Sequence, residues 1–415
     1  MKFGIFGVIS GDSFFVCLYK KYKNEDFNGR CTKMQLYRKG MRNVRNRIGK
    51  MSGKMLIVGV MTIAAACLGL TGCGSLTGGR RIVRIAHGQS ETHPEHLGLL
   101  AFEKYVEERL EDRFEVEIFP NEILGSAQKA IELTQTGAID FVVAGTANLE
   151  TFAGVYEIFS MPYLFDSEEV YRTVMQDSAY MEQVYASTDE AGFRVVTWYN
   201  AGTRSFYGKR PIRTPDDLKG MKIRVQQSPA SVSMVNAFGA AAAPMGFGEV
   251  YTAIQQGVID GAENNELALT NNKHGEVAKY YSYNRHQMVP DMLVANVKFL
   301  ESLSEEEYQI FREAALLSTE VELSEWDKSI EEAKKIAVEQ MGVQFIHVDV
   351  DVFKERVLSL HEQMMKDNPK IADLYQHIQK VNQSMRGAAG TDTDMIGDEW
   401  ENADVGGGVQ NGSDA

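Results

Sequence analysis

From Arg81 onward the chain alternates between short apolar segments and amphipathic stretches of helical period. Residues 81–86 predict a first strand, and residues 96–110 predict a helix with its large apolar side chains on or near one face. Apolar and acidic positions alternate in residues 114–119, which predicts a half-buried strand. Strands separated by helices of about 10–15 residues are typical of an α/β fold with mostly parallel pairing.

A six-residue pattern occurs twice, 120 residues apart. Residues 135–140 read QTGAID and residues 255–260 read QQGVID, and in both an amphipathic helix is predicted to end at the glycine before a strand begins. The 415 residues also exceed the roughly 250–300 at which a single hydrophobic core stops growing. We therefore expect two similar lobes, and residues 303–340 predict a helix long enough to bridge them.

Near the N-terminus, residues 41–73 have the features of a bacterial lipoprotein signal. A basic stretch precedes an uncharged apolar run, 55–70, whose 16 residues are fewer than the ~20 that a membrane-spanning helix needs. The run ends in Leu-Thr-Gly-Cys73, which resembles the lipobox, whose cysteine is diacylated and becomes the mature N-terminus. Two acyl chains suffice for stable anchoring. The alternative is a buried core helix followed by an unrelated cysteine.

We accordingly predict a signal peptide over 41–72 and a lipid-anchored tether over 73–80. Cys73 then attaches the protein to the outer face of the cytoplasmic membrane. Because a signal sequence normally starts close to its basic region, translation is predicted to begin at Met41 or Met51, which makes 1–40 an extension foreign to the native protein. At the other end, residues 388–415 are predicted to be a disordered tail.

Composition and charge exclude several classes of protein. With 44% hydrophobic and 24% charged residues, the chain is neither disordered nor fibrous. Beyond residue 72 it has 30 Lys and Arg against 54 Asp and Glu, a net charge of −24, so we expect no nucleic-acid partner. All four cysteines lie before residue 74, so the remainder has neither a disulfide framework nor a thiolate metal site.

Sequence motifs of catalysis and cofactor binding are absent. The chain has no P-loop, no dinucleotide-binding glycine fingerprint, no nucleophile elbow and no zinc-protease helix. His93 and His96 are three residues apart, but Pro94 disfavours a shared helical face. We therefore predict no catalytic residues, no metal and no cofactor.

Residues 213–229 form the most informative segment. Apolar and basic residues alternate from 221 to 225, which predicts a strand with Arg224 opposite its apolar face. Ser228 then fits a helix N-cap, and Pro229 fits the first helical position. Arg224 would lie beside free backbone N–H groups at the carboxyl edge of a parallel sheet, which suits an anion. The alternative is an ordinary solvated arginine on a strand.

Over about residues 82–365 the chain resembles the extracytoplasmic solute receptors of TRAP (tripartite ATP-independent periplasmic) transporters. The matching segments, in family order, are FPNEILG at 119–125, MPYLF at 161–165, LKGMKIRV at 218–225, FGA at 238–240, PMGFGEVY at 244–251 and GAEN at 261–264. The resemblance implies a periplasmic-binding-protein type II-like fold, with two α/β lobes around a ligand cleft, hinge strands and a long bridging helix. Its predicted parts are lobe I, 82–201 plus 290–329, and lobe II, 202–289 plus 330–387.

The resemblance also assigns ligand-binding residues. The arginine with which the family holds a carboxylate matches Arg224, a second arginine matches Arg204, and an asparagine matches Asn264. Phe247 matches an aromatic residue of the family, and Gln227 stands at a position that often contacts ligand. A planar guanidinium donates to both oxygens of a carboxylate, which lysine cannot reproduce. The alternatives are a salt bridge for Arg204, a core position for Phe247 and a turn cap for Asn264.

Polar residues of the first lobe indicate which acid is bound. Glu91 and His93 follow the first strand, and with Asn148 they are predicted to contact the distal end of the ligand. Glu91 would repel a second acidic group, whereas sugar hydroxyls can bond to Glu91 and His93. This favours a sugar acid such as a hexuronate over a C4-dicarboxylate or sialic acid. The alternative for Glu91 is a helix cap.

We therefore predict a monomeric solute receptor that binds an organic acid and delivers it to the small and large membrane subunits of a TRAP transporter. No reaction is catalysed in this interpretation. A receptor that feeds a sensor kinase would have the same sequence features. A surface-anchored enzyme acting on sugar acids is a third interpretation, which the missing catalytic motifs disfavour.

Overall fold

A computed structural model describes residues 3–10, 13–20 and 80–389. The predicted signal peptide, Cys73, nearly all of the tether and the chain beyond 389 lie outside these residues. Strands β1 (Phe3–Ser10) and β2 (Ser13–Lys20) pair antiparallel and belong to a unit separate from the chain after residue 77. Within the described residues, no helix combines the length and the apolar character needed to cross a membrane.

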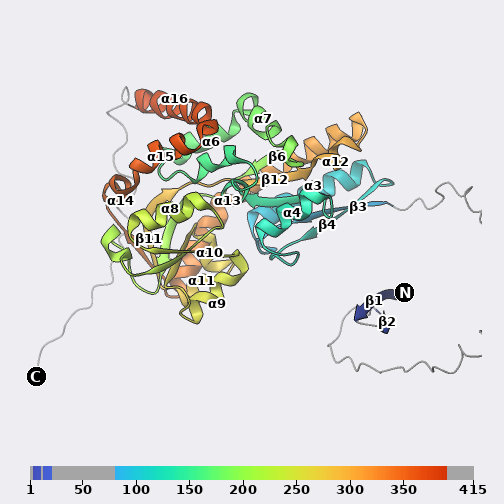
Figure 1. The fold of residues 1–415 in the computed structure, drawn as a ribbon, viewed down its shortest axis with the longest axis horizontal. Helices are drawn as coiled ribbons and strands as arrows, with labels where there is room; N and C mark the ends of the chain where they lie inside the picture. The colour runs from blue at the N-terminus through green and yellow to red at the C-terminus, as the bar shows by residue number, and fades with distance from the viewer. Residues whose placement is uncertain (1–2, 11–12, 21–79, 390–415) are drawn as a thin grey trace, which may run out of the picture. The chain divides into compact units, whose positions relative to one another are not determined.

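The first large sheet has five strands in the order β4-β3-β5-β12-β6, and we call the elements around it lobe I (Figure 1). Alternate residues of β12 enter the two apolar cores on its faces, Met292 and Val294 on one side and Leu293 and Ala295 on the other. Its strands are β3 (Arg81–Ala86), β4 (Phe114–Phe119), β5 (Phe141–Gly145), β6 (Phe193–Tyr199) and β12 (Asp291–Asn296). Its helices are α3 (Pro94–Arg109), α4 (Ala127–Thr136), α5 (Thr146–Leu149), η2 (Gly154–Ser160), α6 (Glu168–Gln176), α7 (Ser178–Ala186), η3 (Asp189–Ala191) and α12 (Val297–Glu301).

The second large sheet has six strands in the order β13-β11-β7-β10-β8-β9, and its elements form lobe II. Apolar cores again cover both faces, with Phe206 on one side of β7 and Tyr207 on the other. Its strands are β7 (Arg204–Gly208), β8 (Lys222–Val225), β9 (Ala241–Pro244), β10 (Gly261–Asn264), β11 (Tyr280–Gln287) and β13 (Gln344–His347). Its helices are η4 (Pro215–Leu218), α8 (Pro229–Phe238), η5 (Phe247–Glu249), α9 (Val250–Gln255), α10 (Leu267–Thr270), α11 (His274–Val277) and α14 (Val350–Val357).

The two lobes contain the same βαβαβ unit. In lobe I, β3 pairs in parallel with β4 and β5, and in lobe II, β8 pairs in parallel with β9 and β10. The six-residue repeat of the sequence lies at the same junction in each unit. Asp140 accepts a hydrogen bond from the backbone N–H of Arg84 at 2.9 Å, and Asp260 accepts one from Lys222 at 2.7 Å. The two aspartates therefore tie the third strand of each unit to the first.

Two short segments and one long helix connect the lobes. Residues 200–203 lead from β6 to β7, and residues 288–290 lead from β11 to β12. Gly202 adopts φ 59°, and a Cβ atom there would lie 2.8 Å from the ring of Trp326, so only glycine fits. Helix α13 (Glu305–Glu339) packs against α3 of lobe I and α10 of lobe II, as expected for the predicted bridging helix.

The C-terminal helices differ from the predicted domain boundaries. These are α15 (Ser359–Asp367), η6 (Pro369–Ile371) and α16 (Ala372–Ala389). Residues up to 357 pack in lobe II, but Leu374 and Ile378 join the apolar core of lobe I, and Asn382 donates to the Leu164 carbonyl at 3.0 Å. The assignment of 330–387 to lobe II is therefore wrong for these helices, because helical periodicity marks the apolar face but not its partner. Helix α16 also includes the first two residues of the predicted tail, 388 and 389.

Candidate ligand-binding cleft

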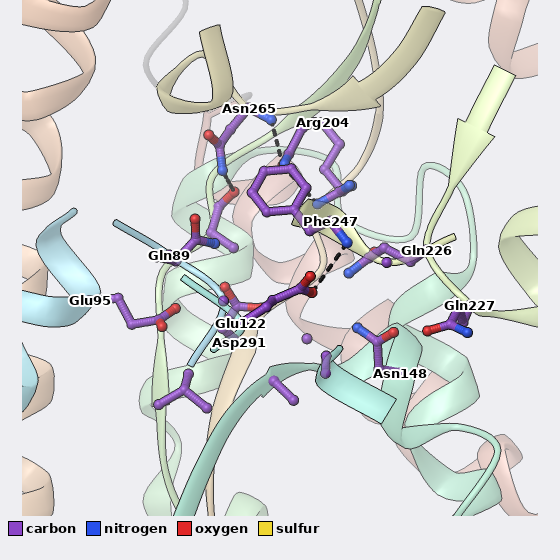
Figure 2. A pocket seen from close by; sticks show the side chains of 18 of the residues that line it. Gln89, Glu95, Glu122, Asn148, Arg204, Gln226, Gln227, Phe247, Asn265 and Asp291 are labelled. Carbon is purple, nitrogen blue, oxygen red and sulfur yellow. Dashed lines mark hydrogen bonds between the residues drawn. The ribbon is translucent and has the colours of Figure 1, made fainter. Parts of the chain in front are cut away.

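A cleft opens between the two lobes at the carboxyl ends of their parallel strands, which is where open α/β sheets bind ligands (Figure 2). Lobe I contributes the loops after β3 and β4, the end of β5 and the start of β12, and lobe II contributes the corresponding ends of β8, β9 and β10. The polar and charged lining residues are Gln89, Glu95, Glu122, Asn148, Arg204, Arg224, Gln226, Gln227, Asn264, Asn265 and Asp291.

Arg224 has a buried guanidinium without an ion-pair partner among the described carboxylates. The residue is 3% exposed, and its Nε and Nη2 both donate to the Met245 carbonyl, at 3.2 and 3.0 Å. Burial lowers the pKa of Arg224, because the charged form loses hydration that neighbouring charges do not replace. The Nη1 donors make no hydrogen bond to the described residues, so the cleft contains a cation that lacks an anion.

Phe247 lies beside this guanidinium. Its ring centroid is 5.5 Å from the Arg224 Cζ atom, within the range of a cation–π contact. The ring is half-buried and also contacts His274 edge-on, at 5.3 Å between centroids. Phe247 therefore lines the cleft while its other contacts hold it against lobe II, which combines the two roles considered from the sequence.

Arg204 lines the same cleft but has a carboxylate partner. Its Nε donates to Glu263 Oε2 at 2.5 Å, its Nη2 donates to Oε1 at 2.9 Å, and its Nη1 donates to Asn264 Oδ1 at 2.9 Å. Burial opposes both charges. The attraction and the hydrogen bonds between Arg204 and Glu263 outweigh this effect of burial, so the pKa of Arg204 is raised. Arg204 and His286 together lower the pKa of Glu263 to about 2. The pair adds no net charge to the cleft.

The remaining predicted residues divide into two groups. Asn148 and Gln227 line the cleft, with Gln227 at its edge in Figure 2. Glu91 is exposed, and His93 is buried as the N-cap of α3, with its Nδ1 accepting from the Glu95 N–H at 3.2 Å. The predicted ligand contacts of these two residues are therefore not supported, because Pro94 starts the helix early and turns Glu95 toward the cleft instead.

Sequence reasoning missed several lining residues, namely Gln89, Glu95, Glu122, Gln226, Asn265 and Asp291. Gln226 directly follows the strand predicted over 221–225, so its position at a strand end was an available signal. Glu95 lies in the first turn of α3, and nothing in its sequence surroundings marks it. The part of the chain that the structure describes contains no group of His, Cys, Asp or Glu arranged to hold a metal ion.

Glu122 crosses the cleft. It lies in the loop after β4 of lobe I, and its carboxylate accepts from the backbone N–H groups of Phe247 at 3.2 Å and Gly248 at 2.8 Å in lobe II (Figure 2). Asn121 and Glu122 both have positive φ angles, 58° and 53°, which are unfavourable for residues with side chains. The loop thus adopts a strained shape that brings a carboxylate of one lobe to the start of η5 in the other.

Comparison with known sequences identifies relatives over most of the chain. The sequence profile of the family described as "Bacterial extracellular solute-binding protein, family 7" matches residues 85–368. The chain is 40% identical over 302 residues to an uncharacterized protein, YiiZ, of Salmonella typhimurium, covering 72% of this chain and 92% of that one. It is 29% identical over 329 residues to the 2,3-diketo-L-gulonate-binding periplasmic protein YiaO of Escherichia coli, covering 77% and 98%.

Solved structures give the same picture. A TRAP periplasmic solute-binding protein of Anaerococcus prevotii, crystallised with bound α/β D-glucuronate, is 51% identical, with a TM-score of 0.72 and coverage of 74% of this chain and 99% of that one. A TRAP periplasmic solute-binding protein of Xanthobacter autotrophicus with bound β-D-galacturonate is 33% identical, with a TM-score of 0.69 and coverage of 72% and 99%. The predicted two-lobed fold is confirmed by these similarities.

Proposed function

Because the chain belongs to the bacterial extracellular solute-binding proteins of family 7, we propose that it is a TRAP solute receptor that binds a hexuronate. The glucuronate- and galacturonate-bound relatives support this ligand class, and so does the relative named for 2,3-diketo-L-gulonate, another sugar acid. The receptor delivers its ligand to the small and large membrane subunits of the transporter and catalyses no reaction.

The unpaired guanidinium of Arg224 is the single observation that carries this proposal. A buried charge is costly unless it is paired, and no described carboxylate pairs with this one. A ligand carboxylate can accept from the free Nη1 donors, which supplies the missing anion. Each charge-assisted bond contributes roughly 1.5–3 kcal/mol, and micromolar affinity requires about −8 kcal/mol. Arg224, one remaining Arg204 donor and the amides of the cleft together account for that affinity.

Ligand binding and lobe closure are coupled in this proposal. The ligand lies between donors of lobe II and polar groups of lobe I, so it makes its full set of contacts only when the lobes are together. The connections at 200–203 and 288–290 are the proposed hinge. Glu122 adds two direct bonds between the lobes in the closed state.

Attachment to the membrane completes the proposal. The lipobox-like sequence ending at Cys73 supports a diacyl anchor on the outer face of the cytoplasmic membrane. The protein then acts as a monomer near its membrane subunits.

A thermal-shift screen of the purified protein tests the ligand class. The panel contains hexuronates, aldonates, C4-dicarboxylates and sialic acid. We expect a hexuronate to give the largest rise in melting temperature, since a ligand at 100 times its Kd adds about 2.7 kcal/mol to stability. A rise with succinate or malate alone would exclude the sugar-acid assignment.

A further inference from the structure

Two acidic side chains of lobe I line the cleft that also contains Arg224 of lobe II. Glu95 comes from the first turn of α3, and Asp291 is the first residue of β12. Figure 2 shows Glu95 on the left of the view, Gln226 and Asn148 on the right, and Asp291 between them. Each carboxyl group contributes to the shift in the pKa of the other, so the two acids interact within the cavity.

No lysine or arginine among the described residues forms a salt bridge with this pair. Glu95 Oε1 is 3.3 Å from Nδ1 of His87, but that nitrogen already accepts from the Gln89 N–H at 3.2 Å and so carries no proton to donate. Burial lowers the pKa of His87 to about 4, so its imidazole is neutral at pH 7. Arg204 is near enough to oppose the rise in the pKa of Asp291, but its guanidinium is paired with Glu263. Glu95 Oε1 therefore remains buried without a hydrogen-bond partner.

Burial accordingly favours the protonated form of the pair. It raises the pKa of Glu95 to about 8 and raises the pKa of Asp291 well above its ordinary value, where the neighbouring Glu95 charge acts in the same direction. A protonated carboxyl has both an O–H donor and a carbonyl acceptor. This combination matches a hydroxyl group, which also donates and accepts, and it offers no positive charge to a carboxylate.

Gly145 brings a third polar group to the same place. A Cβ atom at Gly145 would lie 2.8 Å from Gln226 Nε2 and 3.0 Å from Asp291 Oδ1, so the absence of a side chain lets the two approach across the cleft. Gln226 Oε1 is buried and has no hydrogen-bond partner in the described residues. Gln226 Oε1 and Glu95 Oε1 are thus both buried at the cavity without a hydrogen-bond partner in the described residues.

We propose that Glu95 and Asp291 determine ligand specificity by binding the hydroxyl end of a monocarboxylic sugar acid and rejecting acids with a second carboxylate at that end. The proposal rests on the proposed function, because it takes the ligand's first carboxylate to lie at Arg224. A hexarate presents a second carboxylate where a hexuronate presents its anomeric hydroxyl. That charge would be buried beside two acidic groups with no unpaired cation to compensate it, because Arg204 is paired with Glu263 and Arg224 binds the first carboxylate. The cleft therefore accepts hexuronates and excludes hexarates.

Isothermal titration calorimetry with D-glucuronate and D-glucarate tests this specificity. We expect the wild-type protein to bind D-glucuronate at least 100-fold more tightly than D-glucarate. In the double variant Glu95→Gln/Asp291→Asn, amide N–H donors replace the carboxyl groups at nearly the same volume. We expect the affinity of this variant for D-glucuronate to stay within about tenfold of that of wild type. We expect the ratio of its affinity for D-glucuronate to its affinity for D-glucarate to fall at least tenfold.

A ratio that stays unchanged in the double variant, or a wild-type protein that binds D-glucarate as tightly as D-glucuronate, would overturn the proposal. If the double variant does not fold, Asp291→Asn alone is measured and must reduce the ratio in the same direction. The variant Arg224→Lys tests the proposed function separately from the specificity proposal. Loss of D-glucuronate binding in Arg224→Lys with an unchanged ratio in the carboxyl variants would refute the specificity proposal and leave the proposed function intact. Wild-type protein that binds neither sugar acid would refute the proposed function.

Discussion

Arg204 and Arg224 lie in one cleft, but their surroundings give them different roles. Arg204 is held by both oxygens of Glu263, so its charge is neutralised within lobe II before any ligand arrives. Arg224 donates only to a backbone carbonyl and keeps Nη1 free. We therefore expect Arg224 to supply the charge that binds the ligand, and Arg204 to supply position and one further hydrogen bond.

Replacement of Arg224 by lysine tests this division of roles. Lysine keeps the charge but cannot donate to the Met245 carbonyl and to both oxygens of a carboxylate together. We expect the Kd for D-glucuronate to rise about 100-fold, which corresponds to about 3 kcal/mol. Calorimetry measures the change, and Arg213→Lys, on an exposed residue outside the cleft, is the matched control. Equal affinities in the two variants would remove Arg224 from its assigned role.

Buried carboxyl groups also make stability depend on pH. Burial raises the pKa of Glu95 to about 8 and that of Glu150 to about 7, so the folded state holds these protons more tightly than the unfolded state. The free energy of unfolding then falls as pH rises from their unfolded values toward 8. Burial lowers the pKa of His87 to about 4 and of His93 to about 3, which acts in the opposite direction but only below pH 6.5.

Between pH 6.5 and pH 8 the carboxyl effect is therefore unopposed by these histidines. We expect the melting temperature of wild type to fall across this interval. We expect Glu95→Gln to reduce the accompanying loss of unfolding free energy by up to about 2 kcal/mol. Thermal melts at several pH values measure this. Glu115→Gln, on an exposed residue of β4, is the control, and a Glu95→Gln slope identical to wild type would contradict the assignment.

Among the elements, the loop after β4 acts as a clasp between the lobes. Its Glu122 carboxylate accepts from the first backbone N–H groups of η5, and a side chain on Gly248 would come within 2.9 Å of Glu122 Oε2. The clasp does not need to contact the ligand to affect its release, because the lobes must separate before the ligand leaves.

The variant Glu122→Ala tests the clasp. We expect the ligand dissociation rate to rise about tenfold, since two partly exposed hydrogen bonds to a carboxylate contribute about 1–2 kcal/mol together. The loss applies to every ligand alike, so the ranking of sugar acids should not change. Stopped-flow or surface-plasmon measurements give the rate, with Glu115→Ala as control. A changed ranking would mean that Glu122 contacts the ligand directly and is not a clasp.

The elements themselves were largely predictable. The strands at 81–86 and 114–119 and the helix start at Ser228 and Pro229 appear as predicted, because alternation and capping chemistry are local properties of the sequence. The QTGAID repeat indicated the duplicated unit for the same reason. The partner of α16 was not predictable, since its apolar face fits either lobe until the chain is folded.

The cleft was predictable only in part. Arg224, Arg204, Asn264 and Phe247 were identified through family motifs and line the cleft. Glu95 was missed, although it lies two residues beyond His93. Only the packing of α3 decides which side chain of its first turn points into the cleft. Long-range contacts of this kind leave no local pattern in the sequence.

For the whole molecule, the two lobes divide the chemistry of recognition. Lobe II supplies the unpaired cation, and lobe I supplies protonatable acids and amides. A ligand with a carboxylate at one end and hydroxyl groups at the other can form hydrogen bonds with the cleft residues of both lobes at once. In the proposed function, closure around such a ligand also brings Glu122 of lobe I to the start of η5 in lobe II.

A crystal structure of the protein with D-glucuronate tests the central claim most directly. We expect the sugar carboxylate to accept from Nη1 of Arg224, with the hydroxyl groups at the opposite end directed toward Glu95 and Asp291. A structure in which the carboxylate lies away from Arg224, while that guanidinium keeps only its bonds to the Met245 carbonyl, would contradict the account.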